Sequence, residues 1–582
     1  MMAESKAEVY LLVDIGHVLT HVAYVAPVEG TARLAAVAEA STTTAGSPDG
    51  LLEGLRRAVG NLELLIGRQL LDSAGGLRRP RDSDGHGVDG VAVSTSLASP
   101  LKVALVGLTQ DLSLASALRA ISVPYITVTR MISLEASTRR CETEDLEALV
   151  QDPPDAVVLV GGIDGGPVAP IRDMGESLSA ACSVLPENQR PVVLFAGNER
   201  AHRSLIAAFS GVLDLRLLPN VRPSIRTENL GELRSELTRL FYSRELTHAD
   251  ELHTVSIWAG ANVMYQLDAM ARTLRFIAGR YSLQNGVLGI DIGGGGSRVL
   301  LVYPKGAALT WGTPFGTGMG LAALRKMGNP TGVVRWMHHP LSWAEAWERL
   351  SNVEVRPAGV PQSDEDWDLQ EASAREVLDH SWAGARAAWA DYAGAARVDR
   401  PVDLILARGT VLSCARTPGQ AALTLLDGLQ PHGLSRLALD WANLLPGLTG
   451  LAQLNPLAAV QVTDNDALLE LGTLVAPRGS IRRGATAARV RLLVQGERRA
   501  ELSVPAGSIR RLPLGVNERG RLEIHLARGL NLGRPGRSVV AEVRGGALGV
   551  IVDARGRPLA LPADETIRRE TLESWQREID EA

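Results

Sequence analysis

Cysteine is scarce in this 582-residue chain, which contains only Cys141, Cys182 and Cys414. The three positions form no CxxC pair and no other paired spacing. The sequence therefore predicts neither a disulfide framework nor a cysteine-based zinc site, and it favours a reducing compartment.

Histidine offers no alternative metal cluster. His338 and His339 are adjacent, so they cannot both face one metal from a helix, and His248 and His253 are five residues apart rather than four. We interpret all four as surface or packing residues.

Long apolar runs are also absent. No stretch approaches the ~18–20 uninterrupted apolar residues of a membrane-spanning helix, and the N-terminal apolar run is too short for a signal peptide. The net charge of −5, with 21% charged and 45% hydrophobic residues, gives no whole-chain signal for nucleic acid or membrane. These absences predict a cytoplasmic protein, and the length of 582 residues predicts several domains.

The most informative stretch that is present is Val287–Pro304, VLGIDIGGGGSRVLLVYP. An apolar run ends in Asp291, and Gly293–Gly296 and Ser297 precede a second apolar run, which predicts two strands joined by a glycine turn. A turn without Cβ atoms lets backbone N–H groups curl around an anion, and a carboxylate at the strand end can hold a metal ion or a water. The segment is neither a Walker motif nor a Rossmann fingerprint.

The same design occurs near the N-terminus, where Val9–Ala26 reads VYLLVDIGHVLTHVAYVA. It again joins a strand, an Asp-Ile-Gly sequence (Asp14 to Gly16), a turn and a strand. Two copies predict two related half-domains that present their turns to one shared ligand, and the combination suits a nucleotide phosphate carrying Mg²⁺.

Between the two copies, Pro48–Leu71 has the apolar spacing of an amphipathic helix, and Ser73–Gly90 is predicted to be a loop. From Val91 to about Ser243, short apolar runs alternate with helical stretches, which predicts a parallel sheet with crossover helices. The expected strands are Val103–Val106, Tyr125–Val128, Ala156–Val160, Val192–Phe195 and Leu215–Leu218.

Gly161–Gly166, GGIDGG, lies at the carboxyl end of one of these strands. Such ends line the ligand crevice of a parallel sheet, so Asp164 could anchor a second binding site. The alternative is that the glycines only permit a tight turn into a helix. Gly312–Gly320, GTPFGTGMG, leaves a similar choice between lining the cleft and a flexible connection.

Helical periodicity marks Ser342–Ala396, whose tryptophans we interpret as packing residues. Val402–Leu412, VDLILARGTVL, predicts a third strand that ends in a ligand-facing glycine turn. Thr417–Leu429 and Asp464–Ala476, DNDALLELGTLVA, are both expected to be helices, with Gly472 allowing close packing.

Beyond Pro477 the composition shifts. Ile481–Leu561 contains sixteen Arg, no Lys and six acidic residues, and its apolar residues alternate in short runs between Gly/Pro turns. This predicts a small β-rich domain whose basic surface is either a solvated face or a contact for a protein partner. Nucleic acid is disfavoured because stacking aromatics are missing there. Asp564–Asp580 is expected to form a helix.

Several of these segments resemble those of a known family. The sequences at Asp14, at Asp291, at Gly409 and in the stretch DALLELGT follow the order of the phosphate, phosphate, adenosine and connecting motifs of the actin-like ATPase superfamily. More specifically, VSTSLASPLKVALVGL, PDAVVLVGGIDGG, RPVVLFAGNE, TPGQAALTLLDGLQP and LNPLAAVQV resemble the glutamate mutase accessory protein family, the methylaspartate mutase L component. The resemblance covers roughly Val9 to Pro477.

This resemblance implies an α/β fold with a duplicated ribonuclease-H-like (actin-like ATPase) core, an inserted parallel α/β module and a C-terminal β-rich domain. The expected segments are 1–90 and 244–478 for the two halves, with a helical insertion at 342–396, 91–243 for the module, and 479–582 for the arginine-rich β domain and C-terminal helix.

The resemblance also implies ATP and Mg²⁺ in the cleft and a role as ATPase or chaperone for an adenosylcobalamin-dependent mutase. Asp14 and Asp291 would position Mg²⁺ and its waters as catalytic and metal-binding residues. The implied nucleotide-binding residues are Gly16, Thr20, Gly293, Gly294, Gly295, Gly296, Ser297, Gly409 and Thr410.

The chain departs from the family pattern in all three loops. His17, Val18 and Leu19 replace small hydroxyl residues in the first loop, so that only Thr20 keeps a hydroxyl, and Arg298 closes the second loop after Gly296 and Ser297. In the adenosine loop Arg408 precedes Gly409 where consecutive glycines are usual. The alternative function is therefore a catalytically inactive scaffold that binds partners through its C-terminal β domain.

Overall fold

The computed structural model describes residues 8–43, 50–97, 101–121, 126–134, 139–248, 250–305, 308–327, 331–389, 398–479 and 481–581. Of the expected elements, the ends at Pro48 and Tyr125 and the last part of the helical insertion, 390–396, lie outside these residues. The chain divides into two compact units, one formed by Met1–Leu97 with Glu251–Ala582 and the other by Ala98–Asp250.

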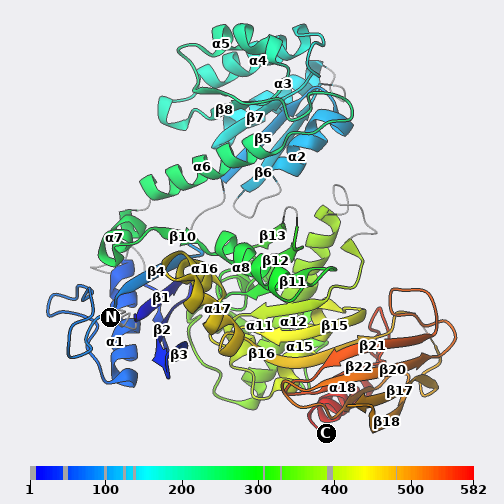
Figure 1. The fold of residues 1–582 in the computed structure, drawn as a ribbon. Helices are drawn as coiled ribbons and strands as arrows, with labels where there is room; N and C mark the ends of the chain where they lie inside the picture. The colour runs from blue at the N-terminus through cyan, green and yellow to red at the C-terminus, as the bar shows by residue number, and fades with distance from the viewer. Residues whose placement is uncertain are drawn as a thin grey trace. The chain divides into compact units, whose positions relative to one another are not determined.

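The first sheet of the larger unit has the strand order β10-β4-β1-β2-β3 (Figure 1). Strands β1, β2 and β3 pair antiparallel, whereas β4 pairs parallel with β1, and β10 parallel with β4. The five strands are β1 (Tyr10–Ile15), β2 (Leu19–Val28), β3 (Thr31–Ser41), β4 (Gly90–Thr95) and β10 (Val263–Tyr265).

The second sheet repeats this scheme in the order β13-β12-β11-β14-β15. The first three strands again pair antiparallel and the next two parallel. These strands are β11 (Val287–Ile292), β12 (Ser297–Val302), β13 (Leu309–Thr313), β14 (Leu404–Arg408) and β15 (Gly433–Leu439). Identical order and pairing in both sheets confirm the predicted pair of related halves.

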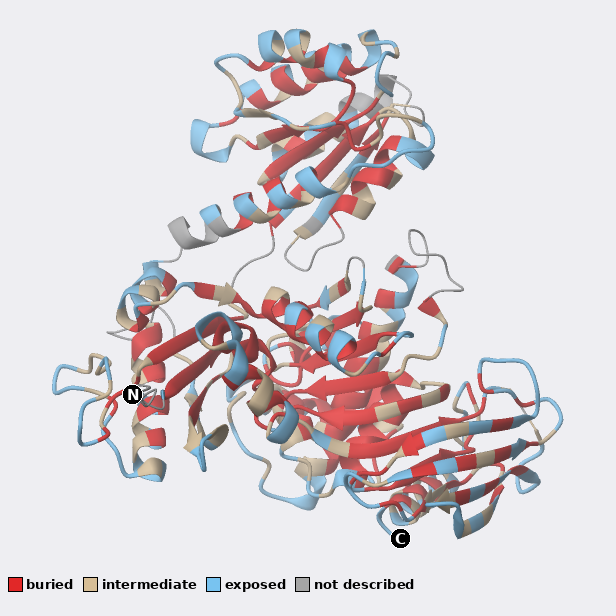
Figure 2. Cartoon of the chain, in the orientation of Figure 1, coloured by how far each residue is buried: buried red, intermediate tan, exposed pale blue. Residues whose placement is uncertain are grey.

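Helices pack on the two sheets, and Figure 2 shows the central strands β1, β4, β11 and β14 buried. In the first half the apolar stripe of α1, including Leu55, Val59 and Leu62, is buried. The helices around the first sheet are α1 (Leu51–Ile66), α7 (Asp250–Ala259), α8 (Gln266–Arg280), α16 (Leu445–Leu454) and α17 (Pro456–Asn465). Those of the second half are α9 (Leu321–Lys326), α10 (Thr331–Val334), α11 (Trp343–Val355), α12 (Asp364–Trp389), α14 (Thr410–Ser413) and α15 (Pro418–Leu429).

The expectation of a helix over Asp464–Ala476 is wrong. Helix α17 ends at Asn465, and Leu469–Ala476 forms strand β16, which pairs with β15 and with β22. A short apolar run cannot by its periodicity distinguish a buried strand from a helix. Gly472 does allow a close approach, because a Cβ atom there would lie 2.0 Å from the carbonyl oxygen of Gly549.

The C-terminal region is β-rich as predicted, and it is joined to the second half. Strands β16, β22 and β19 extend the second sheet to eight strands, while β17, β18, β20 and β21 form a separate four-stranded antiparallel sheet. The strands are β17 (Thr486–Val494), β18 (Glu497–Pro505), β19 (Ile509–Leu512), β20 (Arg519–Leu526), β21 (Ser538–Arg544) and β22 (Val550–Asp553).

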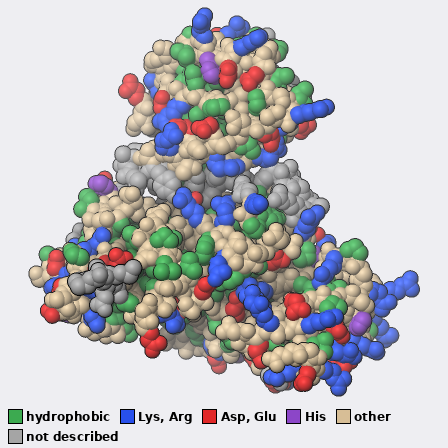
Figure 3. Space-filling view, in the orientation of Figure 1, with side chains coloured by type: hydrophobic (Ala, Val, Ile, Leu, Met, Phe, Trp, Pro, Cys, Tyr) green, Lys and Arg blue, Asp and Glu red, His purple; other side chains and the backbone are tan. Residues whose placement is uncertain are grey.

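Arginine side chains gather on the exposed face of this four-stranded sheet (Figure 3). Several of them face carboxylates on neighbouring strands, since Arg491 pairs with Glu501 and Glu523, and Arg498 with Glu501. Exposed pairs of this kind contribute little to stability. The face is therefore a mixed, ion-paired surface.

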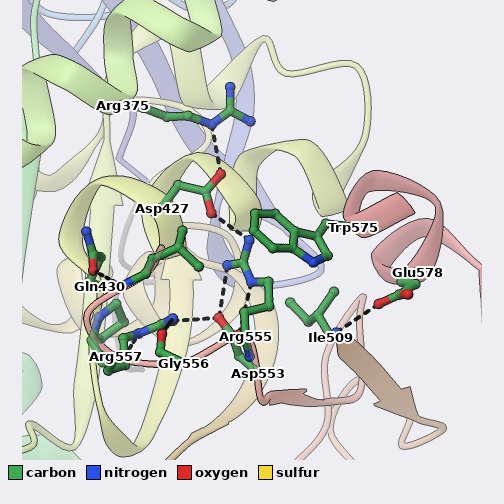
Figure 4. Close-up of polar contacts among 12 residues, drawn as sticks. Arg375, Asp427, Gln430, Ile509, Asp553, Arg555, Gly556, Arg557, Trp575 and Glu578 are labelled. Carbon is green, nitrogen blue, oxygen red and sulfur yellow. Dashed lines mark hydrogen bonds and ion pairs between the residues drawn. The ribbon is translucent and has the colours of Figure 1, made fainter. Parts of the chain in front are cut away.

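A buried ion network fixes the C-terminal region to the second half (Figure 4). Asp427 on α15 accepts from Arg375 on α12 at 2.9 Å and from Arg555 at 2.7 Å, and Arg555 in turn donates to Asp553 at the end of β22. The predicted C-terminal helix, α18 (Glu565–Asp580), packs on α15 and β19, with Trp575 over Arg555. The network thus ties together three elements far apart in sequence.

The smaller unit is a five-stranded, fully parallel sheet in the order β6-β5-β7-β8-β9, which confirms the predicted parallel module. Its strands are β5 (Leu101–Gly107), β6 (Ile126–Ser133), β7 (Ala156–Val160), β8 (Val192–Phe195) and β9 (Leu215–Leu217). Its helices are α2 (Ala115–Ala120), α3 (Arg139–Gln151), α4 (Ala169–Ser183), α5 (His202–Phe209) and α6 (Gly231–His248).

The GGIDGG segment follows β7 and is tied down by two buried asparagines. Asn198 donates to the carbonyl oxygen of Gly166 at 3.0 Å, and Asn220 donates to that of Gly162 and to Asp164 at 3.0 and 2.8 Å. These contacts hold the turn in place from within the unit, as the tight-turn interpretation requires.

No helix in the described ranges is long and apolar enough to cross a membrane.

Candidate functional site

Asp14 and Asp291 occupy equivalent positions in the two sheets. Each lies one residue before the end of the central strand, β1 or β11. In the parallel neighbour, Asp14 faces Ser94 and Asp291 faces Arg408. Both carboxylates are buried, with exposed fractions of 4% and 6%. The duplicated fold therefore brings the two predicted carboxylates to one place, where the halves meet.

The turns that follow these strands also match. The amide of Gly16 donates to the carbonyl oxygen of Leu19 at 2.9 Å, and that of Gly293 to Gly296 at 3.0 Å. Among the described residues, the amides of Gly294 and Gly295 donate to no other group. These two amides are the donors that an anion at the turn would use.

The Gly312–Gly320 segment lies against the second turn. The amides of Thr317 and Gly318 donate to the carbonyl oxygens of Gly293 and Gly294 at 3.1 and 3.0 Å, and Thr317 lines the cavity between the halves. Of the two alternatives that the sequence left open, the structure supports the lining of the cleft.

The two turns touch each other. A Cβ atom at Gly294 would lie 2.4 Å from Cγ2 of Val18, and one at Gly295 would lie 2.8 Å from Cβ of His17. The side chains that replace the small hydroxyl residues of the first turn therefore fill the space in front of the glycines.

Gly409 and Thr410 follow β14 and border the same cavity. Gly409 has φ +120°, and a Cβ atom there would lie only 2.2 Å from the carbonyl oxygen of Ile292. Thr410 begins α14. The third predicted element thus joins the two turns.

Two predicted residues lie outside the cavity lining. The hydroxyl of Thr20 is 2.9 Å from that of Thr42, and the hydroxyl of Ser297 is 2.9 Å from that of Thr313 and 2.6 Å from that of Ser381. The cavity is lined by Asp14, Gly16, His17, Val18, Ser96, Gln266, Asp291, Gly293, Gly294, Gly295, Gly296, Arg298, Thr317, Trp367, Gln370, Arg408, Gly409, Thr410 and Asn443, among others.

Arg408 borders this cavity and is buried, with an exposed fraction of only 3%. Its Nη2 atom lies 2.6 Å from Oδ2 of Asp14, and its Nε atom lies 3.8 Å from both Oδ1 of Asp291 and Oδ2 of Asp440. Gln266 donates to Asp14 as well, at 3.0 Å. The guanidinium is therefore surrounded by carboxylates from both halves.

Burial and charge act against each other in this cluster. Burial opposes the charge of Arg408, but Asp291, Asp14 and Asp440 together raise the pKa of its guanidinium. Burial raises the pKa of Asp291, with Arg408 and Arg298 opposing it, and burial raises the pKa of Asp440 to about 6 despite Arg408 and two backbone amides. Arg408 therefore remains charged and compensates the carboxylates only in part.

The sequence alone reveals neither Asp440 nor the role of Arg408. Asp440 directly follows β15, so its position at a strand end in the second sheet was the available signal. Ser94 and Gln266, which bind Asp14, carry no comparable pattern.

The raised pKa of Asp440 predicts a pH dependence of stability. Because the folded state binds this proton more tightly than the unfolded state, whose pKa is near 3.9, the contribution of Asp440 to stability falls as the pH rises through about 6. Relative to Asp440→Asn, the wild type should lose on the order of 1 kcal/mol between pH 5 and 7. Urea unfolding of both proteins at the two pH values measures this difference, and a constant difference would contradict the assignment.

Mg²⁺ does not fit this arrangement. The ion takes carboxylate oxygens at ~2.0–2.1 Å and keeps several waters, but the Arg408 guanidinium already lies between Asp14 and Asp291. In the described ranges there is also no group of three His, Cys, Asp or Glu side chains that could hold a metal ion. The residues that the resemblance assigns to the metal are thus engaged by a cation of the chain itself.

The chain has the actin-like ATPase fold. Its two ribonuclease-H-like sheets have identical topology, and the central strand of each leads into an Asp-Ile-Gly turn that lines one cleft. The family described as MutL protein matches residues 10–467. The chain therefore belongs to this family, that of the glutamate mutase L component, as the sequence predicts.

Comparison with solved structures finds distant similarity to several proteins. Acetone carboxylase in a nucleotide-free structure shares 10% identity at a TM-score of 0.33, covering 86% of this chain and 81% of that one. The diol dehydratase-reactivating factor in nucleotide-free form shares 10% sequence identity at a TM-score of 0.30, and the match covers 77% of this chain and 99% of that one. Component A of (R)-2-hydroxyglutaryl-CoA dehydratase from Acidaminococcus fermentans shares 9% sequence identity at a TM-score of 0.25, and the match covers 78% of this chain and 99% of that one. The search of curated proteins found no match.

Proposed function

We propose that this chain is a nucleotide-binding accessory protein for an adenosylcobalamin-dependent mutase in the cytoplasm. Membership of the family of the glutamate mutase L component supports the partnership. The observation that carries the nucleotide site is the convergence of both Asp-Ile-Gly turns and Gly409 on one cavity.

Binding would act as a conformational switch. ATP phosphates would accept hydrogen bonds from the amides of Gly294 and Gly295, with the adenosine toward Gly409 and Thr410. Because His17 and Val18 pack against the glycines, we expect phosphate binding to move the two turns apart. Nucleotide occupancy is thereby coupled to the separation of the halves, which a client enzyme can sense.

Trimming the contact between the turns should strengthen nucleotide binding. Val18→Ala removes the methyl groups that face Gly294, so less packing is lost when the turns separate. We expect a several-fold lower Kd for ATP by isothermal titration. Val28→Ala, on the exposed end of β2, is the matched control and should leave the Kd unchanged. A weaker or unchanged affinity of Val18→Ala would contradict this binding mode.

A catalytically inactive scaffold is the second candidate, and the ion pairing of Asp14 by Arg408 favours it. The two functions differ in an assay with glutamate mutase inactivated by turnover. An accessory switch restores mutase activity only when ATP is present, whereas a scaffold forms a complex on size-exclusion chromatography that ATP does not alter. If ATP restores no mutase activity and no complex forms, the proposed partnership is wrong.

A further inference from the structure

We propose that Arg408 is the resident cation of the cleft: it takes the place of a divalent metal between the two Asp-Ile-Gly aspartates and holds the two halves together without one. This inference concerns the chain alone and does not depend on the mutase partnership.

The position of the guanidinium supports this assignment. Arg408 ends β14 of the second half, yet its shortest ion pair, 2.6 Å, is with Asp14 at the end of β1 in the first half. Its contacts with Asp291 and Asp440 come from the second half. One side chain thus links carboxylates of both halves, as a metal ion bridging the cleft would do.

Arg408 occupies a position that a small residue holds in the first half. In the first sheet the residue that faces Asp14 on the parallel neighbour is Ser94, whose hydroxyl donates to Asp14 at 2.7 Å. In the second sheet the equivalent position, opposite Asp291, is Arg408. The aspartate of the first half thus faces a neutral side chain on the neighbouring strand, and the aspartate of the second half faces a charged one.

Electrostatics excludes a second cation. A divalent ion between Asp14 and Asp291 would lie within a few ångströms of a guanidinium that cannot lose its proton and that three carboxylates hold in place. The tethered arginine also needs no ion from solution, so neither chelation nor added metal should affect the cleft.

Some buried polar atoms of the cluster have no hydrogen-bond partner among the described residues. Nε and Nη1 of Arg408 have no hydrogen-bond acceptor among the described residues, nor does Oδ1 of Asn443 have a donor, and both residues line the cavity. Buried polar atoms of this kind are satisfied by water or by a ligand. An oxyanion that enters the cleft would thus meet arginine donors where a metal complex would be expected.

Manganese binding tests the inference directly. Mn²⁺ is titrated into the purified full-length chain and the free ion is followed by its electron paramagnetic resonance signal. We expect the wild type to bind no Mn²⁺ at the cleft and EDTA to leave its Tm unchanged. Arg408→Ala should bind one Mn²⁺ per chain, and Arg408→Ala combined with Asp291→Asn should lose it. Arg408→Met, which keeps most of the side-chain volume, repeats the test if the alanine variant does not fold.

Two outcomes would overturn the inference. One is a wild-type chain that binds one Mn²⁺ in a manner abolished by Asp291→Asn. The other is a folded Arg408→Ala or Arg408→Met variant that binds none. Either result would leave the mutase assay to decide the proposed partnership separately.

Discussion

Replacing Asp553 by alanine is expected to lower the free energy of unfolding by about 3–5 kcal/mol. Asp553 is fully buried and accepts from Arg555 at 3.0 and 2.9 Å and from Arg557 at 2.5 Å (Figure 4). Burial opposes its ionisation, but the two guanidinium groups hold the pKa of Asp553 well below its usual range. The variant would leave two buried arginines with one carboxylate fewer.

Urea unfolding measures this loss, and Glu501→Ala is the matched control. Glu501 also contacts two arginines, Arg491 and Arg498, but its side chain is 44% exposed. Its removal should cost no more than about 1 kcal/mol. Equal losses for the two variants would mean that the buried network is not what fixes the C-terminal region to the second half.

The second large effect is expected at Gly409. Gly409→Ala places a Cβ atom 2.2 Å from the carbonyl oxygen of Ile292 at a backbone φ of +120°. This backbone conformation costs about 1–3 kcal/mol in a residue with a Cβ atom and the overpacking about 1–3 kcal/mol more, so a total loss of about 2–6 kcal/mol is expected. The displaced loop should also weaken ATP binding, because Gly409 borders the cavity.

Gly496→Ala separates the two contributions. Gly496 has φ +86°, but no atom lies within 4 Å of the added Cβ, so only the backbone term of about 1–2 kcal/mol applies. Chemical denaturation and ATP titration of both variants provide the comparison. A Gly409→Ala protein that is as stable as Gly496→Ala would show that the contact with Ile292 relaxes freely.

Much of the fold could be predicted because the decisive signals are local. The two Asp-Ile-Gly turns, the alternation of strands and helices up to Ser243, and the helix after Asp564 depend on residues adjacent in the chain. Strand β16 was missed because only its long-range pairing with β15 and β22 distinguishes LELGTLVA from a helix. The extension of the second sheet by β19 and β22 is likewise a non-local pairing.

For the site, too, local sequence patterns were predictable and long-range contacts were not. Sequence order identified Asp14, Asp291, the glycine turn and Gly409, since each follows an apolar run. It also marked Arg408 as a departure from the family pattern. That Arg408 reaches Asp14, 394 residues away, depends on how the two halves pack. The assignment of nucleotide roles to these residues stays a prediction, whereas Arg408 lies where the resemblance would place a metal ion.

The order of strands has a consequence for synthesis on the ribosome. The first sheet needs β10, which emerges only after residues 98–250, and the second sheet needs β22, which ends at Asp553. Domains generally fold as their chain emerges. The smaller unit can therefore fold while the first sheet still waits for its last strand, and the eight-stranded sheet is completed only when nearly the whole chain has left the exit tunnel.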